Sequence, residues 1–305
     1  MAKITVQELM AESGVAFGTS GARGEVAAMT DRVCYGYTCG FLAYLAEPGD
    51  FAPDGRVALA GDLRPSTPRI LAACARAIGD SGGVPVFCGY VPTPALALYA
   101  FAHTLPSLMV TGSHIPADRN GIKFYRPASE MLKHDEPGMG RQVIDLRADT
   151  FASNGDLTLP ELLPQVTDVE DAYVARYVAH FGAGALTGKR IGVYQHSAVG
   201  CDVLVRIVRE LGAEVESLGR SDTFIPVDNE AIRPAAIRTM MPDARIALTT
   251  WYDQPLGCLC GAAFKATTRA CVRIRSTTAP CSPASHRGAG CSKHVDRAFS
   301  DHAGS

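Results

Sequence analysis

A serine, a histidine and a lysine lie within eleven residues of one another, on a predicted loop that directly follows an apolar segment. They belong to the run Val110-Thr111-Gly112-Ser113-His114-Ile115-Pro116, followed by Asn120-Gly121-Ile122-Lys123. Serine is a weak nucleophile that needs a partner to take its proton. Phosphoryl transfer depends mainly on positioning and on cations that balance the phosphate oxygens. Ser113 could therefore hold a phosphate whose charge Lys123 offsets, with His114 or Lys123 exchanging a proton with a substrate hydroxyl.

A second feature is a glycine-rich turn near the N-terminus that carries one guanidinium group. It reads Phe17-Gly18-Thr19-Ser20-Gly21-Ala22-Arg23-Gly24. Arginine can hold a phosphate through two parallel hydrogen bonds, so Arg23 is a candidate phosphate-binding residue. Thr19 and Ser20 of the same turn are further phosphate-binding candidates. Taken alone, the Ser113-His114 pair is also explained by an ordinary polar loop. The sequence contains neither a Gly-x-Ser-x-Gly elbow at Ser113 nor a nucleotide-binding P-loop.

Strands that alternate with helices are predicted to position the loop that contains Ser113. Strands are predicted over residues 56–61, 84–88 and 107–110. Helices are predicted over 68–80, with Thr67 as the N-cap and Pro68 at the first helical position, and from the cap Thr93 to about residue 103. This alternation predicts a three-layer α/β domain with a mixed, largely parallel sheet. Ligands of such sheets bind beyond the carboxyl ends of the strands. The loop of Ser113 would leave the 107–110 strand at that edge.

A second α/β unit is predicted to follow, and it looks incomplete. Its elements are a helix over 171–180, a strand over 189–194, a helix over 199–211 and a strand over 213–218. The predicted organisation is a first domain over 1–150, a linker over 151–168, an incomplete second domain over 169–257 and a tail over 258–305. The tail contains only four Val, Ile, Leu or Met residues. It cannot bury enough apolar surface to offset the entropy of ordering it, so we expect it to be disordered or poorly packed.

Composition favours a cytoplasmic protein without nucleic-acid or membrane partners. The formal net charge is −2, which gives no general electrostatic attraction to either. The N-terminus has Glu8 where the apolar run of a secretory signal would begin. Prolines interrupt the longest uncharged stretch, 81–117, so that no twenty-residue apolar span remains. Cys34, Cys39, Cys74, Cys88 and Cys201 stand singly and are predicted to be reduced thiols.

Two other polar groups could be taken for sites. Cys281, His286, Cys291 and His294 are possible zinc ligands, but their spacing is not that of a standard finger. Incidental Cys and His in an unstructured tail is the favoured interpretation. His196-Ser197, before the predicted 199–211 helix, could be a second catalytic pair. A polar loop between strand and helix is the favoured interpretation there.

Five motifs in order resemble one known family. They are Phe17-Gly18-Thr19-Ser20-Gly21-Ala22-Arg23-Gly24, Gly61-Asp62-Leu63-Arg64, Val91-Pro92-Thr93-Pro94, Thr111-Gly112-Ser113-His114-Ile115-Pro116 and Asn120-Gly121-Ile122-Lys123. This set resembles the N-terminal domain of the α-D-phosphohexomutases, most closely the bacterial phosphomannomutase/phosphoglucomutase group. The resemblance extends over roughly residues 15–235. Ile115 departs from it, because many relatives carry Asn in the serine loop.

The resemblance implies interconversion of hexose 1- and 6-phosphates, with mannose and glucose as the expected sugars. Ser113 matches the serine that is phosphorylated in the resting enzyme and donates its phosphate to the sugar. The resulting bisphosphate reorients and returns a phosphate to the serine. Arg23 matches a phosphate-contacting arginine, and His114 and Lys123 match neighbouring acid and base candidates.

The resemblance also implies Mg²⁺, and here the sequence departs from the family. In the family the ion bridges the serine phosphate, here that of Ser113, and three aspartates of an Asp-Gly-Asp-x-Asp-Arg loop in the second domain. That loop does not occur in the 305 residues, nor do recognisable third and fourth domains. One interpretation is a working mutase. The other is a truncated, catalytically inactive remnant that at most binds or accepts phosphate. This second interpretation is favoured, so turnover by this chain is not expected. Residues 258–305 carry five of the ten cysteines and no Glu, which suggests the hypothesis of a shifted reading frame.

Overall fold

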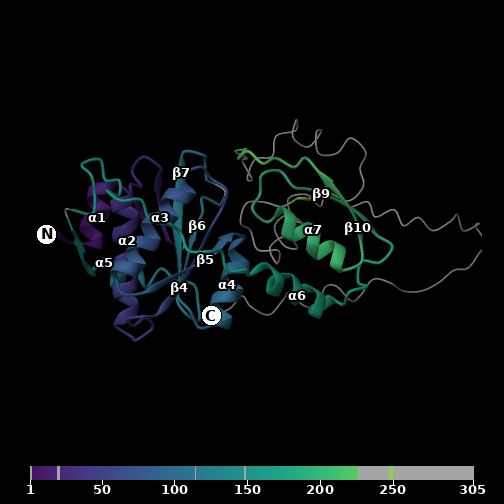
Figure 1. Cartoon of the computed structure of the whole chain (residues 1–305), viewed down its shortest axis with the longest axis horizontal. Coiled ribbons are helices and arrows are strands. Elements are labelled where there is room, and N and C mark those ends of the chain that lie inside the picture. Colours follow the sequence, from purple (N-terminus) through teal and green to yellow (C-terminus); the bar gives the residue numbers. More distant parts are fainter. Residues whose placement is uncertain (1, 19–20, 114, 148, 226–246, 250–305) are drawn as a thin grey trace, which may run out of the picture. The chain divides into compact units, whose positions relative to one another are not determined.

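The computed structural model describes residues 2–18, 21–113, 115–147, 149–225 and 247–249. A six-stranded sheet, drawn in Figure 1, carries Arg23 and Lys123, and Ser113 follows one of its strands. In spatial order its strands are β2 (Ala16–Phe17), β3 (Gly21–Glu25), β7 (Arg119–Tyr125), β6 (Ser107–Val110), β4 (Arg56–Gly61) and β5 (Val84–Tyr90). Strands β6, β4 and β5 are parallel, whereas β2, β3, β7 and β6 pair antiparallel. The predicted mixed sheet is confirmed, but the sheet is not largely parallel: two of its five strand pairs are parallel, on the β5 side, and the three that join β2, β3, β7 and β6 are antiparallel.

Helices cover both faces of this sheet, which confirms the three-layer architecture. On one face, α2 (Asp31–Ala46) and α3 (Thr67–Asp80) pack on the strands, and α1 (Val6–Ser13) and α5 (Glu136–Gly140) pack on α2 and add to the same core. On the other face, α4 (Thr93–Ala102) packs on β4 and β6, and α6 (Glu170–Phe181) packs on α4. The strands alternate accordingly: Leu59 and Leu108 belong to the core on the α2 face, and Ala58 and Met109 to the core on the α4 face.

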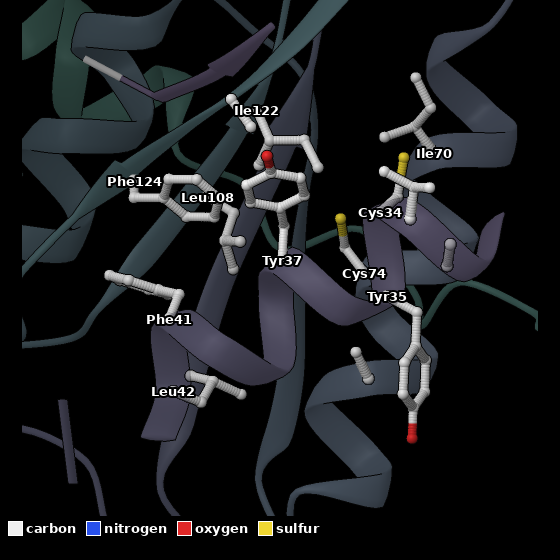
Figure 2. Packing of buried hydrophobic residues seen from close by; sticks show 14 of the residues in the cluster. Cys34, Tyr35, Tyr37, Phe41, Leu42, Ile70, Cys74, Leu108, Ile122 and Phe124 are labelled. Atoms are coloured by element: carbon white, nitrogen blue, oxygen red, sulfur yellow. The ribbon is translucent and has the colours of Figure 1, made fainter. Parts of the chain in front are cut away.

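Helix α2 supplies large buried side chains to the core on its own face of the sheet. Thr30 caps the helix by accepting a hydrogen bond from the backbone N–H of Val33. Tyr37 and Phe41, four residues apart, are fully buried against the sheet (Figure 2). The rings of Phe41 and Phe124 lie with their centroids 4.9 Å apart. Burying each such ring contributes about 2 to 3 kcal/mol.

A small two-stranded sheet adds to the core on the α2 face. Strands β1 (Ala2–Thr5) and β8 (Val143–Leu146) pair antiparallel, and Ile144 and Leu146 join the core on the α2 face. The five cysteines among the described residues carry free thiols, as predicted. Among the described residues, no helix combines the length and the apolar character needed to cross a bilayer.

A second, three-stranded parallel sheet follows in the order β10-β9-β11. It contains β9 (Arg190–Tyr194), β10 (Glu214–Leu218) and β11 (Ala247–Thr249), and α7 (Cys201–Glu210) connects β9 to β10. The predicted helices and strands of this unit are present within one or two residues. The division into domains, linker and tail stays a prediction, and the predicted tail lies outside the described residues.

Three sequence-based expectations about local structure are wrong. The Phe17–Gly24 segment is not simply a turn, because Gly21–Glu25 forms β3. Lys123 lies on strand β7 rather than on the loop. The N-cap of α3 is Ser66 rather than Thr67, since the Thr67 hydroxyl donates to Asp62 Oδ1 at 2.7 Å instead of accepting from the helix. In the first two cases the pairing of β3 with β7, about a hundred residues apart in sequence, outweighs the local preference. In the third the cause is local, because Asp62 takes the hydroxyl of Thr67.

Candidate active site

Ser113 lies in a tight turn directly beyond the carboxyl end of β6. Its side chain is buried, with 4% of its surface exposed, and its φ angle is +53°. The Ser113 amide donates to the Thr111 hydroxyl at 2.9 Å. A residue other than glycine in this left-handed region costs about 1 to 2 kcal/mol. The fold therefore holds this serine in a conformation that it would not adopt in a relaxed loop.

Asp62, at the end of β4, organises that turn. Oδ2 accepts hydrogen bonds from the Thr111 hydroxyl at 2.9 Å and from the Gly112 amide at 3.1 Å. Oδ1 accepts from the Thr67 hydroxyl at 2.7 Å and from the Arg64 amide at 3.0 Å. The Asp62 side chain is almost fully buried. One carboxylate thus joins the ends of two neighbouring strands to the start of helix α3.

Arg64 holds the far side of the serine loop. Its Nη2 donates to the Ile115 carbonyl at 2.6 Å, and its Nη1 to the carbonyls of Pro116 at 2.7 Å and Arg119 at 2.9 Å. Its Nε lies 3.4 Å from Asp62 Oδ2. A Cβ on Gly112 would lie 2.2 Å from Arg64 Cζ, so the loop passes over the guanidinium only because residue 112 is glycine.

Asp62 and Arg64 belong to one of the five motifs, and the motif alone assigns neither residue a role. A signal was available: an aspartate and an arginine stand two residues apart directly after a buried strand. Arg64 is 2% exposed, and a guanidinium buried to that extent needs a carboxylate or carbonyls around it. That requirement points to a structured loop nearby.

Arg23 and Lys123 share one face of the sheet at the same edge. Arg23 pairs with Gly121 across β3 and β7, and Gly21 pairs with Lys123. Residues two apart on a strand point to the same face, so the two cations are diagonal neighbours. The Thr111 amide donates to the Gly121 carbonyl at 3.0 Å. Arg23 therefore lies level with the start of the serine loop, and Lys123 two residues further along the sheet.

The structure places three of the six predicted site residues. Ser113 follows the carboxyl end of β6, Arg23 lies level with the start of its loop, and Lys123 lies two residues further into the sheet, opposite Met109; both cations are half-buried. His114, Thr19 and Ser20 lie outside the described residues. The parallel strands β4 and β6 end at the edge where the loop of Ser113 begins, as the α/β pattern predicted.

Among the described residues, the donor set around Ser113 does not fit a magnesium ion. Mg²⁺ prefers carboxylate and other hard oxygen ligands in octahedral geometry. Asp62 is the carboxylate at the base of the loop, and both of its oxygens are taken by Thr67, Thr111, Arg64 and Gly112. In the described part of the chain, His, Cys, Asp and Glu nowhere gather in threes as a metal site would need.

Sequence comparison identifies the family of this α/β domain and its serine loop. Residues 14–142 match the family model described as "Phosphoglucomutase/phosphomannomutase, alpha/beta/alpha domain I". A phosphomannomutase of Sinorhizobium fredii is 42% identical over 253 residues, covering 80% of this chain and 52% of that protein. A phosphomannomutase of Salmonella muenchen is 42% identical over 225 residues, covering 74% and 45%. The chain belongs to the α-D-phosphohexomutase family.

Solved structures agree on the fold. A crystal structure described as a candidate phosphomannomutase from Thermus thermophilus superposes with a TM-score of 0.59 at 19% identity, covering 78% of this chain and 55% of that one. A phosphoglucomutase/phosphomannomutase family protein from Burkholderia thailandensis gives 0.51 at 22% identity, covering 66% and 43%. The chain spans about half the length of the curated relatives it matches.

His196 and Ser197 form a second buried polar pair, at the carboxyl end of β9. The Ser197 hydroxyl lies 3.1 Å from His196 Nδ1 and accepts a hydrogen bond from the Ile225 amide at 2.9 Å. His196 has a φ of +55°. The hydroxyl therefore fastens a neighbouring backbone segment, in keeping with the interpretation as a polar loop between strand and helix.

Burial of His196 predicts a pH-dependent stability. Desolvation lowers the pKa of this imidazole below its usual 6.5, so the unfolded chain takes up the proton at a higher pH than the folded chain. The free energy of unfolding should be fully retained above about pH 6.5 and should fall as the pH drops below it. In His196→Asn, where Asn tolerates a positive φ, this decline should be smaller. Urea denaturation between pH 8 and pH 5 measures it, and parallel curves for the two proteins would contradict the prediction.

Proposed function

We propose that Ser113 accepts and returns a phosphoryl group in the chemistry of a phosphohexomutase. The overall reaction would be intramolecular phosphotransfer between hexose 1-phosphate and hexose 6-phosphate, with mannose or glucose as the sugar. One observation carries the proposal: a buried serine in a left-handed turn shares a sheet edge with Arg23 and Lys123. That edge lies within the segment matched by the family's domain I.

The transfer itself needs little more than geometry and charge. The bond between phosphorus and Ser113 Oγ breaks as a sugar hydroxyl oxygen bonds to phosphorus, and the proton of that hydroxyl passes to a neighbouring base. The reverse step returns a phosphoryl group to the serine. Arg23 and Lys123 would offset the negative charge on the phosphate oxygens. His114 and Lys123 are the proposed acid and base, and Thr19 and Ser20 are proposed as further phosphate contacts.

A second candidate function is phosphate acceptance without sustained turnover by this chain. Two observations favour it: no Asp-Gly-Asp-x-Asp-Arg occurs in the sequence, and the described donors around Ser113 do not fit Mg²⁺. Without a divalent ion, the serine phosphate and an incoming sugar phosphate repel each other. A bound metal ion normally contributes several kcal/mol to stabilising such charge. The Mg²⁺ that the family resemblance implies stays a proposal.

Intact-mass spectrometry after incubation with a hexose 1,6-bisphosphate tests the phosphate acceptor. We expect the mass of the wild-type chain to increase by one phosphoryl group and that of Ser113→Gly to stay unchanged. Glycine adopts the +53° φ without strain, so this variant removes the hydroxyl while keeping the turn. Ser81→Ala, a half-buried serine at the end of α3, is the matched control and should behave as wild type. Phosphorylation of Ser113→Gly, or none in the wild type, would contradict the proposal.

A coupled assay with mannose 1-phosphate and magnesium separates the two candidate functions. We expect the purified chain to show no sustained formation of mannose 6-phosphate. Robust turnover that Ser113→Gly abolishes would overturn the second candidate and establish a complete mutase.

A further inference from the structure

We infer that Phe224 is a positioning residue for the serine loop and that it acts through Arg64. The catalytic significance of this inference rests on the proposed function, whereas the contact itself does not. Phe224 follows β10, and its place in the sequence is more than a hundred residues beyond the loop that it would support.

The first step is the contact between Phe224 and Arg64. Arg64 Cζ lies 5.3 Å from the centroid of the Phe224 ring, within the range of a cation–π interaction. The Arg64 side chain is 2% exposed, so water screens this attraction weakly. An aromatic ring can accept the guanidinium face, while the N–H groups along the guanidinium edge remain available to oxygen acceptors.

Those N–H groups hold the serine loop. Arg64 donates to the carbonyls of Ile115, Pro116 and Arg119 at 2.6 to 2.9 Å. Gly112, next to Ser113, packs directly on the same guanidinium. A shift of the Arg64 side chain would therefore move three carbonyls and one glycine of the loop together.

The second step is the anchoring of Phe224 itself. Residues 221–225, which we call the anchor segment, are tied to the loop that follows β9. The Ser221 amide donates to the His196 carbonyl at 2.9 Å, and the Ile225 amide donates to the Ser197 hydroxyl at 2.9 Å. Phe224 stands between these two attachments. Its ring is therefore presented to Arg64 by a segment fixed at both ends.

Together these contacts connect the second sheet to the serine loop. The sequence of contacts runs from Ser197 to the anchor segment, from Phe224 to Arg64, and from Arg64 to the carbonyls around residue 115. Order in the serine loop should then depend on an element outside the domain that contains it. A purely space-filling Phe224 would be replaced without loss by leucine, whereas a cation–π partner would not.

Hydrogen exchange measured by mass spectrometry on the full chain tests this inference. In Phe224→Leu we expect peptides covering residues 111–121 to exchange about tenfold faster than in wild type, because the loop opens locally more often. Phe224→Tyr keeps the ring and should restore wild-type exchange. Ser197→Ala, which releases the Ile225 amide, should raise exchange in the same peptides by a smaller factor.

Phe181→Leu is the matched control, since Phe181 is an exposed aromatic residue on α6 whose ring packs against Tyr177 and His180. It should leave residues 111–121 unchanged. Three results would overturn the inference: unchanged exchange in Phe224→Leu, a rise in Phe224→Tyr equal to that in Phe224→Leu, or a uniform rise over the whole chain.

The same samples distinguish failure of the inference from failure of the proposed function. If wild type takes up no phosphate from the bisphosphate but Phe224→Leu loosens the loop, the proposed function fails and the positioning role stands. If wild type is phosphorylated and Phe224→Leu leaves the loop unchanged, the positioning role fails and the proposed function stands.

Discussion

Replacing Asp62 with alanine is expected to lower the free energy of unfolding by about 3 to 5 kcal/mol, the cost of leaving a buried charge without its partner. The carboxylate lies 3.4 Å from the Arg64 Nε, and both side chains are at most 2% exposed. The substitution also removes the acceptor of the Thr111 hydroxyl and the Gly112 amide. These two groups set the turn at Ser113, so phosphate acceptance should be lost together with stability.

Urea denaturation of paired variants measures this effect. Asp118→Ala is the control: it removes an exposed aspartate of the same loop region and should change the free energy of unfolding by less than about 0.5 kcal/mol. Asp62→Asn should fall between the two, because it keeps oxygen and volume but loses the charge opposite Arg64. If Asp62→Ala were as stable as Asp118→Ala, the carboxylate would not be what holds the serine loop.

The elements that sequence reasoning located correctly are those with a clear local pattern. Strands β4 and β6 were predicted at their observed bounds, because short apolar runs end there in polar turns. The alternation with α3 and α4 then placed Ser113 at the carboxyl edge of the sheet. This prediction needed only patterns of about a dozen residues.

Helix α2 was missed because its pattern makes sense only in the tertiary structure. Gly36 and Gly40 lower its helix propensity. A Cβ on Gly36 would lie 2.5 Å from Leu9 Cδ2, and one on Gly40 would lie 2.2 Å from Val6 Cγ2. These glycines let α1 pack closely on α2, so packing outweighs local preference. No pattern within α2 alone could show this.

The residue types of the candidate site could be predicted from the sequence, but the hydrogen bonds and strand pairing that hold them could not. Ser113, Arg23 and Lys123 were proposed from spacing and motif. The hydrogen bonds that hold the loop join Asp62 to Gly112 and Arg64 to Ile115, about fifty residues away in sequence. Such pairings depend on which strands become neighbours. The antiparallel β3–β7 pairing, which brings Arg23 and Lys123 to one face, has the same dependence.

Replacing Gly21 with alanine is expected to lower the free energy of unfolding by about 3 kcal/mol and to reduce phosphate acceptance. A Cβ on Gly21 would lie 2.1 Å from the Ile122 carbonyl oxygen and 2.8 Å from Lys123 Cα, both backbone atoms of the neighbouring strand. Backbone atoms in a paired strand cannot rotate away as a flexible side chain can. Strands β3 and β7 would have to separate locally, and this separation would change the spacing between Arg23 and Lys123.

Thermal and urea denaturation of Gly21→Ala beside Gly79→Ala tests whether close strand approach is the cause. Gly79 lies on the exposed side of α3, where an added Cβ meets nothing within 4 Å, and alanine there should stabilise the chain by up to about 1 kcal/mol. Phosphate acceptance should survive in Gly79→Ala and fall in Gly21→Ala. If both variants gained stability, the β3–β7 pairing would tolerate a side chain at residue 21, and the argument that it fixes the two cations beside Ser113 would fail.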